Sequence, residues 1–279
     1  NGVEIPGALY QSFGTTWRNI DEILLKDEDF GKYLKMKNPL QEEMKSISLE
    51  GLTTDEKVAR IYTFLKERIT WNEEYALYGS NIRKSIKEGN ANNATLNFIF
   101  MSMLRDAGIT SYPLVMSRRS RGILPYAHPS ISKINTFIVG IMGDDEKMMF
   151  LDGSVTHGYI NILPPVLLVD RARIVSEKGG DNWVALKRLG RNQQKCLLQI
   201  KFTSDGKMTG TKSTSFSGQY AASYRQQYKA AKDSIEFVTK LEDNHKIKID
   251  SYDLKGMHTF SPTIKEDISF TQDTDLNSE

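Results

Sequence analysis

The residues between Gly89 and Ile109 have the types and spacing that could hold a reactive group at the start of a buried helix. A polar loop begins at Gly89, and either Asn92 or Asn93 can cap the helix that follows. The free N–H groups and the dipole at such a helix start stabilise a thiolate or an oxyanion. Apolar residues recur at helical spacing and predict burial nearly all round: Leu96, Ile99, Phe100, Met103 and Leu104, with Phe98 and Met101 on other sides.

A second chemical feature is a run that places three guanidinium groups in four residues, Arg118, Arg119 and Arg121. A guanidinium binds carboxylate or phosphate through two parallel hydrogen bonds, so this run is a candidate site for an anionic ligand. The alternative is a solvated basic loop, because exposed charges usually contact only water. The loop continues past His128 to Ser132, and its length is typical of a cleft wall.

The cysteine and histidine content gives little support for other chemistry. Cys196 is the only cysteine, and we expect it to be a small buried residue at the start of a strand. No Gly-x-Gly-x-x-Gly, P-loop or Gly-x-Ser-x-Gly motif occurs in the sequence. No paired ligand spacing connects the histidines, so we predict neither a metal nor a cofactor: His128, His157, His245 and His258.

The helix motif resembles the nucleophile helix of the transglutaminase-like superfamily, whose fold is papain-like. The family pattern is Gly-x-Cys, an apolar helix and then Leu-Arg-x-x-Gly-Ile, and the last part matches residues 104–109 (LRDAGI). This match puts Asn93 at the cysteine position of the family and Ala91 at its glycine position. Two further motifs follow in order, with Thr136 at the histidine of one strand and Asp152 at the aspartate of the next.

The resemblance covers roughly residues 53–175 and implies a protein that has lost the chemistry of its family. In the family a thiolate attacks an amide carbonyl, a histidine transfers the proton and an aspartate orients the histidine. Near neutral pH the Asn93 carboxamide is not a nucleophile and the Thr136 hydroxyl is not a base. Losing a nucleophile or a base typically lowers an enzyme's rate by about 10⁶. Asp152 remains as an acceptor for loop N–H groups, and Trp71 and His157 are candidates for lining the old cleft.

Hydrophobic periodicity and turn residues predict an α+β protein with a β-rich C-terminal domain. The resemblance implies that the core has helices packed on an antiparallel sheet. We expect a helical lead-in over 1–52, a papain-like core over 53–178, a linker near 177–182 and a C-terminal domain over 183–279 that ends before its last strand. The predicted helices are 17–25, 29–36, 39–47, 53–69, 80–88, 93–106 and 218–241. The predicted strands are 112–117, 134–142, 147–152, 166–169, 173–175, 196–203, 208–216, 246–254 and 264–270.

The composition excludes some function classes. A net charge of +2 and a pI near 8.4 give no case for nucleic-acid binding, and no run of 18 apolar residues could span a membrane. The start at Asn1 is expected to lie inside a longer chain with further domains. The resulting hypothesis is a non-catalytic binding or assembly module of the bacterial cell envelope, exported by family resemblance, whose partner is an acidic peptide or a cell-wall fragment. The alternative is an active cysteine-protease-like or amide-processing enzyme that uses other residues.

Overall fold

The computed structural model describes residues 16–177, 182–257 and 260–273, which form two compact α+β units. The first unit combines the chain up to Thr156 with Leu163–Leu189. The second combines His157–Ile162 with the chain from Gly190. Each unit contains an antiparallel sheet, in agreement with the α+β class expected from the sequence. No helix in the described ranges is long and apolar enough to cross a membrane.

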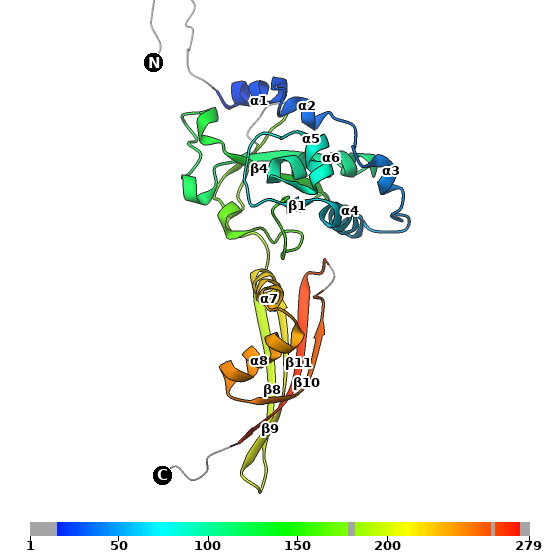
Figure 1. The fold of residues 1–279 in the computed structure, drawn as a ribbon. Coiled ribbons are helices and arrows are strands. Elements are labelled where there is room, and N and C mark those ends of the chain that lie inside the picture. The colour runs from blue at the N-terminus through cyan, green and yellow to red at the C-terminus, as the bar shows by residue number, and fades with distance from the viewer. Residues whose placement is uncertain (1–15, 178–181, 258–259, 274–279) are drawn as a thin grey trace, which may run out of the picture. The chain divides into compact units, whose positions relative to one another are not determined.

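The sheet of the first unit has five antiparallel strands in the order β5-β4-β3-β6-β7 (Figure 1). In its central strands β3 and β4, the residues from Pro113 to Met116 and from Thr136 to Ile141 are all buried, which suits strands covered on both faces. The strands predicted over 134–142 and 147–152 correspond to β4 and β5, which pair in antiparallel fashion. The strands are β3 (Ser111–Met116), β4 (Thr136–Met142), β5 (Met148–Leu151), β6 (Ala172–Ile174) and β7 (Trp183–Val184).

Helix α6 (Asn93–Asp106) packs against this sheet, and every residue from Asn93 to Leu104 is buried. The prediction of a helix buried nearly all round is therefore confirmed. Asn92 is the cap, since its side chain accepts a hydrogen bond from the Thr95 N–H at 2.8 Å. Gly108 follows the last turn with φ +73°, a conformation that glycine adopts without steric cost.

The remaining helices of the first unit are mostly short. The predicted helix over 53–69 is confirmed, and Thr53 and Glu56 form a capping box at its start. The predicted helix over 39–47 is too long, because only Gln41–Met44 is helical. The Asn38 side chain caps a turn before it by accepting a hydrogen bond from the Leu40 N–H at 2.9 Å. These helices are α1 (Trp17–Lys26), α2 (Gly31–Leu34), α3 (Gln41–Met44), α4 (Thr54–Arg68) and α5 (Ile82–Glu88), and β1 (Thr70–Trp71) pairs in parallel with β2 (Asn90–Ala91).

Two sequence expectations about the end of the first unit need correction. Residues 166–169 do not form a strand, because Pro165–Leu167 is a 3₁₀ turn that begins with a proline. β7 pairs with β6, so residues 183–189 belong to the first unit, although we expected them in the C-terminal domain. Most of the expected linker, residues 178–181, lies outside the described residues. The described lead-in, from residue 16, is also part of this unit rather than a separate segment.

The second unit is a four-stranded antiparallel sheet in the order β10-β11-β9-β8, with two helices packed on it (Figure 1). The single helix predicted over 218–241 is wrong, because the chain breaks after Ala230 and Asp233 caps a second helix through the Glu236 N–H at 2.8 Å. The elements are β8 (Gln193–Phe202), β9 (Lys207–Ser217), α7 (Gln219–Ala230), α8 (Ser234–His245), β10 (Lys248–Lys255) and β11 (Thr263–Asp273).

Cys196 is exposed, which contradicts the expectation of a buried residue. It lies on β8, an edge strand of this sheet, and every residue of β8 from Gln194 to Phe202 is exposed. The core of the unit forms instead around β9, β11 and the two helices. The sequence pattern of β8 predicts a strand, but it does not show that the residues of this strand are exposed to solvent. The core residues are Phe216, Ala221, Tyr224, Phe237, Met257 and Ile264.

Candidate functional site

The structure brings Asn93, Thr136 and Asp152 together in one fully buried cluster. Asn93 is the first residue of α6, Thr136 is the first residue of β4, and Asp152 follows the end of β5. The Asn93 Nδ2 donates to Thr136 Oγ1 at 2.8 Å and to Asp152 Oδ1 at 3.0 Å. All three residues have zero exposure, so water does not reach them from outside. The three aligned motif positions are thus direct hydrogen-bond partners.

The Asp152 carboxylate is surrounded by donors rather than by a cation. Oδ1 accepts from Asn93 and from the Asn97 Nδ2, the latter at 2.8 Å. Oδ2 accepts from the Ser154 N–H at 2.9 Å and from the Ser154 hydroxyl. Asn97 Oδ1 in turn accepts from the Gly153 N–H at 2.7 Å. A buried carboxylate needs such donors to replace water, and these fix the 152–154 turn against α6.

Gly153 allows this turn to approach the helix. A Cβ atom at position 153 would lie 2.5 Å from the Cβ of Leu96 and 3.0 Å from the Asn93 carbonyl oxygen. Contacts that short do not occur between real side chains, so a larger residue would push the turn away from α6. The close approach lets Asn97 reach both Asp152 and the backbone of the turn.

The polar groups of Asn93 are all occupied. Its Oδ1 accepts from the Ala76 N–H at 2.8 Å, its backbone N–H donates to the Glu74 carbonyl at 3.1 Å, and its Nδ2 also approaches the Phe137 carbonyl at 3.3 Å. The loop before α5 therefore closes over the start of α6. A backbone N–H held in this way cannot also stabilise an oxyanion, which requires donors directed at the reacting atom.

A partly exposed stack of Trp71, Tyr75 and Arg118 lies next to this cluster. The Trp71 and Tyr75 ring centroids are 4.9 Å apart, and the Arg118 guanidinium carbon is 5.0 Å from the Tyr75 centroid. Asn135 Oδ1 holds Arg118 by accepting from its N–H at 3.1 Å and from its Nε at 3.2 Å. Burial is the main reason that the pKa of Tyr75 is raised to about 12, so this phenol is neutral at physiological pH.

Lys66 and Tyr62, both on α4, complete the surroundings of the 152–154 turn. The Tyr62 hydroxyl lies 2.7 Å from the carbonyl oxygens of Asp152 and Val155. Lys66 Nζ donates to the Gly153 carbonyl at 2.7 Å. Burial lowers the pKa of Lys66 to about 8, while the nearby Asp152 carboxylate acts in the opposite direction.

Lys66 is expected to react with amine acylating reagents at a lower pH than an ordinary lysine. With a pKa of about 8, roughly half of its amine is neutral at pH 8, compared with about 0.3% for a free lysine side chain. Limited acetylation between about pH 7 and pH 10, read by peptide mass spectrometry with Lys57 of the same helix as reference, measures this. A Lys66 labelling rate that still rises tenfold per pH unit above pH 9 would contradict the lowered pKa.

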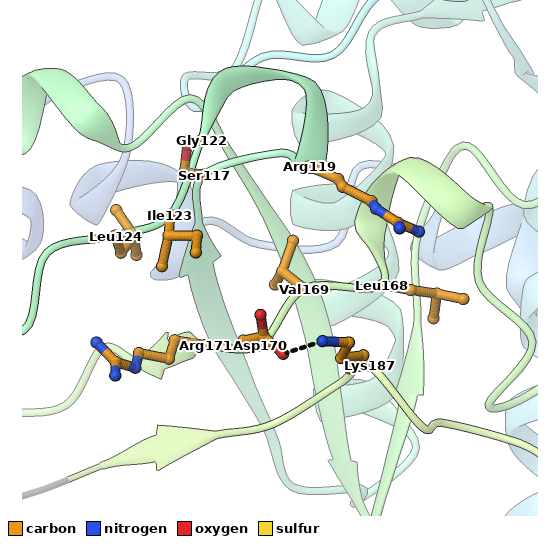
Figure 2. Close-up of a pocket in the computed structure, with 10 residues that line it drawn as sticks. All are labelled: Ser117, Arg119, Gly122, Ile123, Leu124, Leu168, Val169, Asp170, Arg171 and Lys187. Carbon is orange, nitrogen blue, oxygen red and sulfur yellow. Dashed lines mark ion pairs between the residues drawn. The ribbon is translucent and has the colours of Figure 1, made fainter.

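The other candidate residues of the sequence analysis are not part of this cluster. Arg119 lines a separate pocket (Figure 2), and the lining residues of that pocket include neither Arg121 nor His128. Arg121 and His128 are exposed in the loop. His157 belongs to the second unit, where burial and the positive charges of Lys229 and Arg225 lower its pKa. The three arginines of the run therefore lie in three different surroundings rather than forming one cleft wall.

Sequence reasoning missed several residues that hold the cluster. Asn97 is the clearest, because it lies one turn after Asn93 on the same face of α6 and is a polar residue in an otherwise apolar stretch. That position could have identified it as a second amide directed at the same acceptor. Tyr62, Lys66, Tyr75 and Ser154 gave no comparable signal, since only the fold brings them to the cluster.

The described residues contain no group of three or more histidine, cysteine, aspartate or glutamate side chains that could hold a metal ion. A carboxamide, a threonine hydroxyl and a carboxylate bind one another well, but they contain neither a thiol nor an imidazole. As arranged, they form a closed structural network.

Comparison with known proteins does not assign this chain to a family. No family model matches the sequence, and no curated protein matches it. One solved structure, described as a putative protease from Parabacteroides distasonis, is similar over 92% of this chain with 11% sequence identity and a TM-score of 0.38. The matched part is 52% of that chain, so this protein spans about half the length of the structure it matches.

Proposed function

We propose that this protein is a catalytically inactive member of the transglutaminase-like superfamily, with a papain-like core, which serves as a binding or assembly module of the bacterial cell envelope. The observation that carries the proposal is the direct hydrogen bonding of Asn93 to both Thr136 and Asp152. The three positions correspond to the cysteine, histidine and aspartate of the family pattern. In this chain the side chain of Asn93 hydrogen-bonds to those of Thr136 and Asp152. We infer that this network stabilises the papain-like core, although the thiol and the imidazole of the family are absent.

The main alternative is an amide-processing enzyme that uses residues outside this cluster. Cys196 is the one thiol in the chain, and it is exposed on the second unit. An exposed thiol needs a neighbouring base or positive charge to become a nucleophile at neutral pH. Because the buried cluster contains neither a thiol nor an imidazole, we expect no turnover of fluorogenic peptide amides and no amine incorporation above the buffer rate. A rate above that level which is lost in the C196S variant would overturn the proposal in favour of the enzyme.

Restoring the family residues provides a second test. The double variant N93C/T136H is expected to fold with reduced stability, because the Ala76 N–H and the Asp152 carboxylate each lose a partner. Its new thiol, at the start of α6, should titrate below the ordinary cysteine pKa of about 8.5. The single variant N93C, which lacks the base, is the matched control and should show a smaller shift.

Catalysis by the double variant is expected to remain poor, because Ala91 and the loop that covers α6 differ from a working site and catalysis needs close placement of its groups. A thiol that titrates like free cysteine in both variants would contradict the proposed correspondence with a nucleophile position. Rapid turnover by the double variant would show that the site has kept its substrate pocket and only lost two side chains.

A further inference from the structure

Strand β8 forms an open edge of the sheet in the second unit (Figure 1). It is the last strand in the order β10-β11-β9-β8, and β9 is the one strand that pairs with it in the described ranges. Every residue from Gln194 to Phe202 is exposed. An edge strand presents a row of backbone N–H and C=O groups with which another chain can pair. β8 is therefore a place where the sheet can gain a strand.

The register of β8 shows which of its backbone groups face outward. The Thr203 N–H donates to the Lys207 carbonyl at 2.8 Å, and the pairing with β9 continues from there to Gln193 without a register shift. Because antiparallel residues alternate between hydrogen-bonded and non-hydrogen-bonded pairs, the odd-numbered residues of β8 bond to β9. The N–H and C=O groups of the even-numbered residues point away from β9: Gln194, Cys196, Leu198, Ile200 and Phe202.

The side chains of the even-numbered residues form an uncovered apolar row. Gln194 pairs with Phe216, a core residue, so these side chains lie on the core face of the sheet. Leu198, Ile200 and Phe202 are nevertheless 50, 43 and 73% exposed. A strand added at this edge would place its own alternate side chains beside them and remove apolar surface from water. A suitable partner strand is therefore apolar at every second residue.

The opposite face of β8 carries charges of one sign. Lys195 and Lys201 are exposed, neither forms an ion pair within the described part of the chain, and β8 contains no acidic residue. The other edge strand, β10, differs because it carries both signs and pairs Lys255 with Asp253 at 3.4 Å. The two lysines of β8 are six residues apart, or about 20 Å along a strand. A partner with acidic residues at the same spacing would place a carboxylate opposite each lysine.

We propose that β8 binds an extended segment of a partner protein as an additional antiparallel strand, and that this segment alternates apolar residues with acidic ones. The apolar residues lie beside Leu198, Ile200 and Phe202, and the acidic residues pair with Lys195 and Lys201. A second copy of β8 fits less well, because it would bring further lysines and no carboxylate to this edge. The proposal goes beyond the function proposed above, since it concerns the second unit and does not depend on the buried cluster.

The test is fluorescence anisotropy of the 279-residue chain with a labelled ten-residue peptide. Valine occupies the even positions of the peptide up to the eighth, glutamate the third and the ninth, and threonine the others, so that the two glutamates face Lys201 and Lys195. An N-methyl group on the fourth residue removes the N–H that donates to Ile200 and should weaken binding at least about tenfold. The same group on the fifth residue, whose N–H points away from β8, is the matched control and should change the affinity by less than about threefold.

Exchanging the charges of β8 tests the acidic part of the proposal. The double variant K195E/K201E should lose about tenfold in affinity for the glutamate peptide and should prefer a version that has lysine at both positions. The double variant K248E/K255E makes the same change of net charge on β10, where both lysines are exposed. It is the matched control, and its affinity for the glutamate peptide should stay within about threefold of the parent.

Residue-resolved hydrogen exchange locates the added strand. The peptide should increase amide protection at Leu198 and Ile200, whose N–H groups face outward, and change it little at Gln199, which already bonds to β9. Absence of peptide binding, equal weakening by the two N-methyl groups or an equal loss in K248E/K255E would overturn the proposal. Protection of the outward amides without peptide, together with a dimer in sedimentation, would overturn the choice of partner in favour of a second copy.

Discussion

The D21A variant is expected to lower the melting temperature of the first unit by about 6–20 °C, from a loss of roughly 3–5 kcal/mol. Asp21 and Arg173 form an ion pair with two hydrogen bonds, and their side chains are only 1% and 2% exposed. The Arg173 guanidinium also lies beside the edge-to-face pair of Trp17 and Trp183, 5.7 and 5.6 Å from their ring centres. Removing Asp21 takes away the carboxylate that neutralises this buried guanidinium, which costs more than the pair itself contributes.

The double variant D21L/R173M should recover much of this loss, because two apolar residues of similar size leave no charge to desolvate. E22A is the matched control, since it removes a neighbouring carboxylate of α1 whose pair with Arg18 is exposed. It should cost less than about 1 kcal/mol. Thermal unfolding followed by circular dichroism distinguishes these cases. A D21A melting temperature equal to that of E22A would show that the lead-in helix is not held by this pair.

The D152A variant is expected to lose about 3–5 kcal/mol of the free energy of unfolding of the first unit. The change removes the acceptor from four donors, the side-chain amides of Asn93 and Asn97 and both donors of Ser154. Each buried donor left without an acceptor costs about 1–3 kcal/mol before the site relaxes. D152N, which keeps one acceptor oxygen, should lose about half as much.

Denaturant unfolding measures the loss, and amide hydrogen exchange locates it. Protection should fall first at the Gly153 and Ser154 N–H groups, which depend on Asn97 and Asp152. D145A is the control, because it removes a carboxylate of the β4–β5 turn whose side chain is 60% exposed. It should change stability by no more than about 0.5 kcal/mol. Unchanged protection in D152A would mean that the turn is held by Lys66 and Tyr62 rather than by the carboxylate.

Several features of this protein followed from the sequence because they depend on near neighbours along the chain. The buried helix α6 could be predicted from its apolar spacing, and the start of α4 from the pairing of Thr53 with Glu56. The grouping of Asn93, Thr136 and Asp152, which are distant along the chain, was indicated only by the resemblance to the three family motifs. Asn97 could have been added from its position one turn further along α6.

The tertiary structure alone decided the features that depend on distant parts of the chain. Asp21 and Arg173 are 152 positions apart, and no local pattern indicates that they form a buried pair. Cys196 has a strand-like surrounding sequence, but its exposure follows from the place of β8 at the sheet edge. The three arginines are neighbours in the sequence, yet Arg119 lines a pocket while Arg118 packs on Tyr75. Periodicity determines which face of an element is buried, whereas strand order and long-range packing determine which residues it meets.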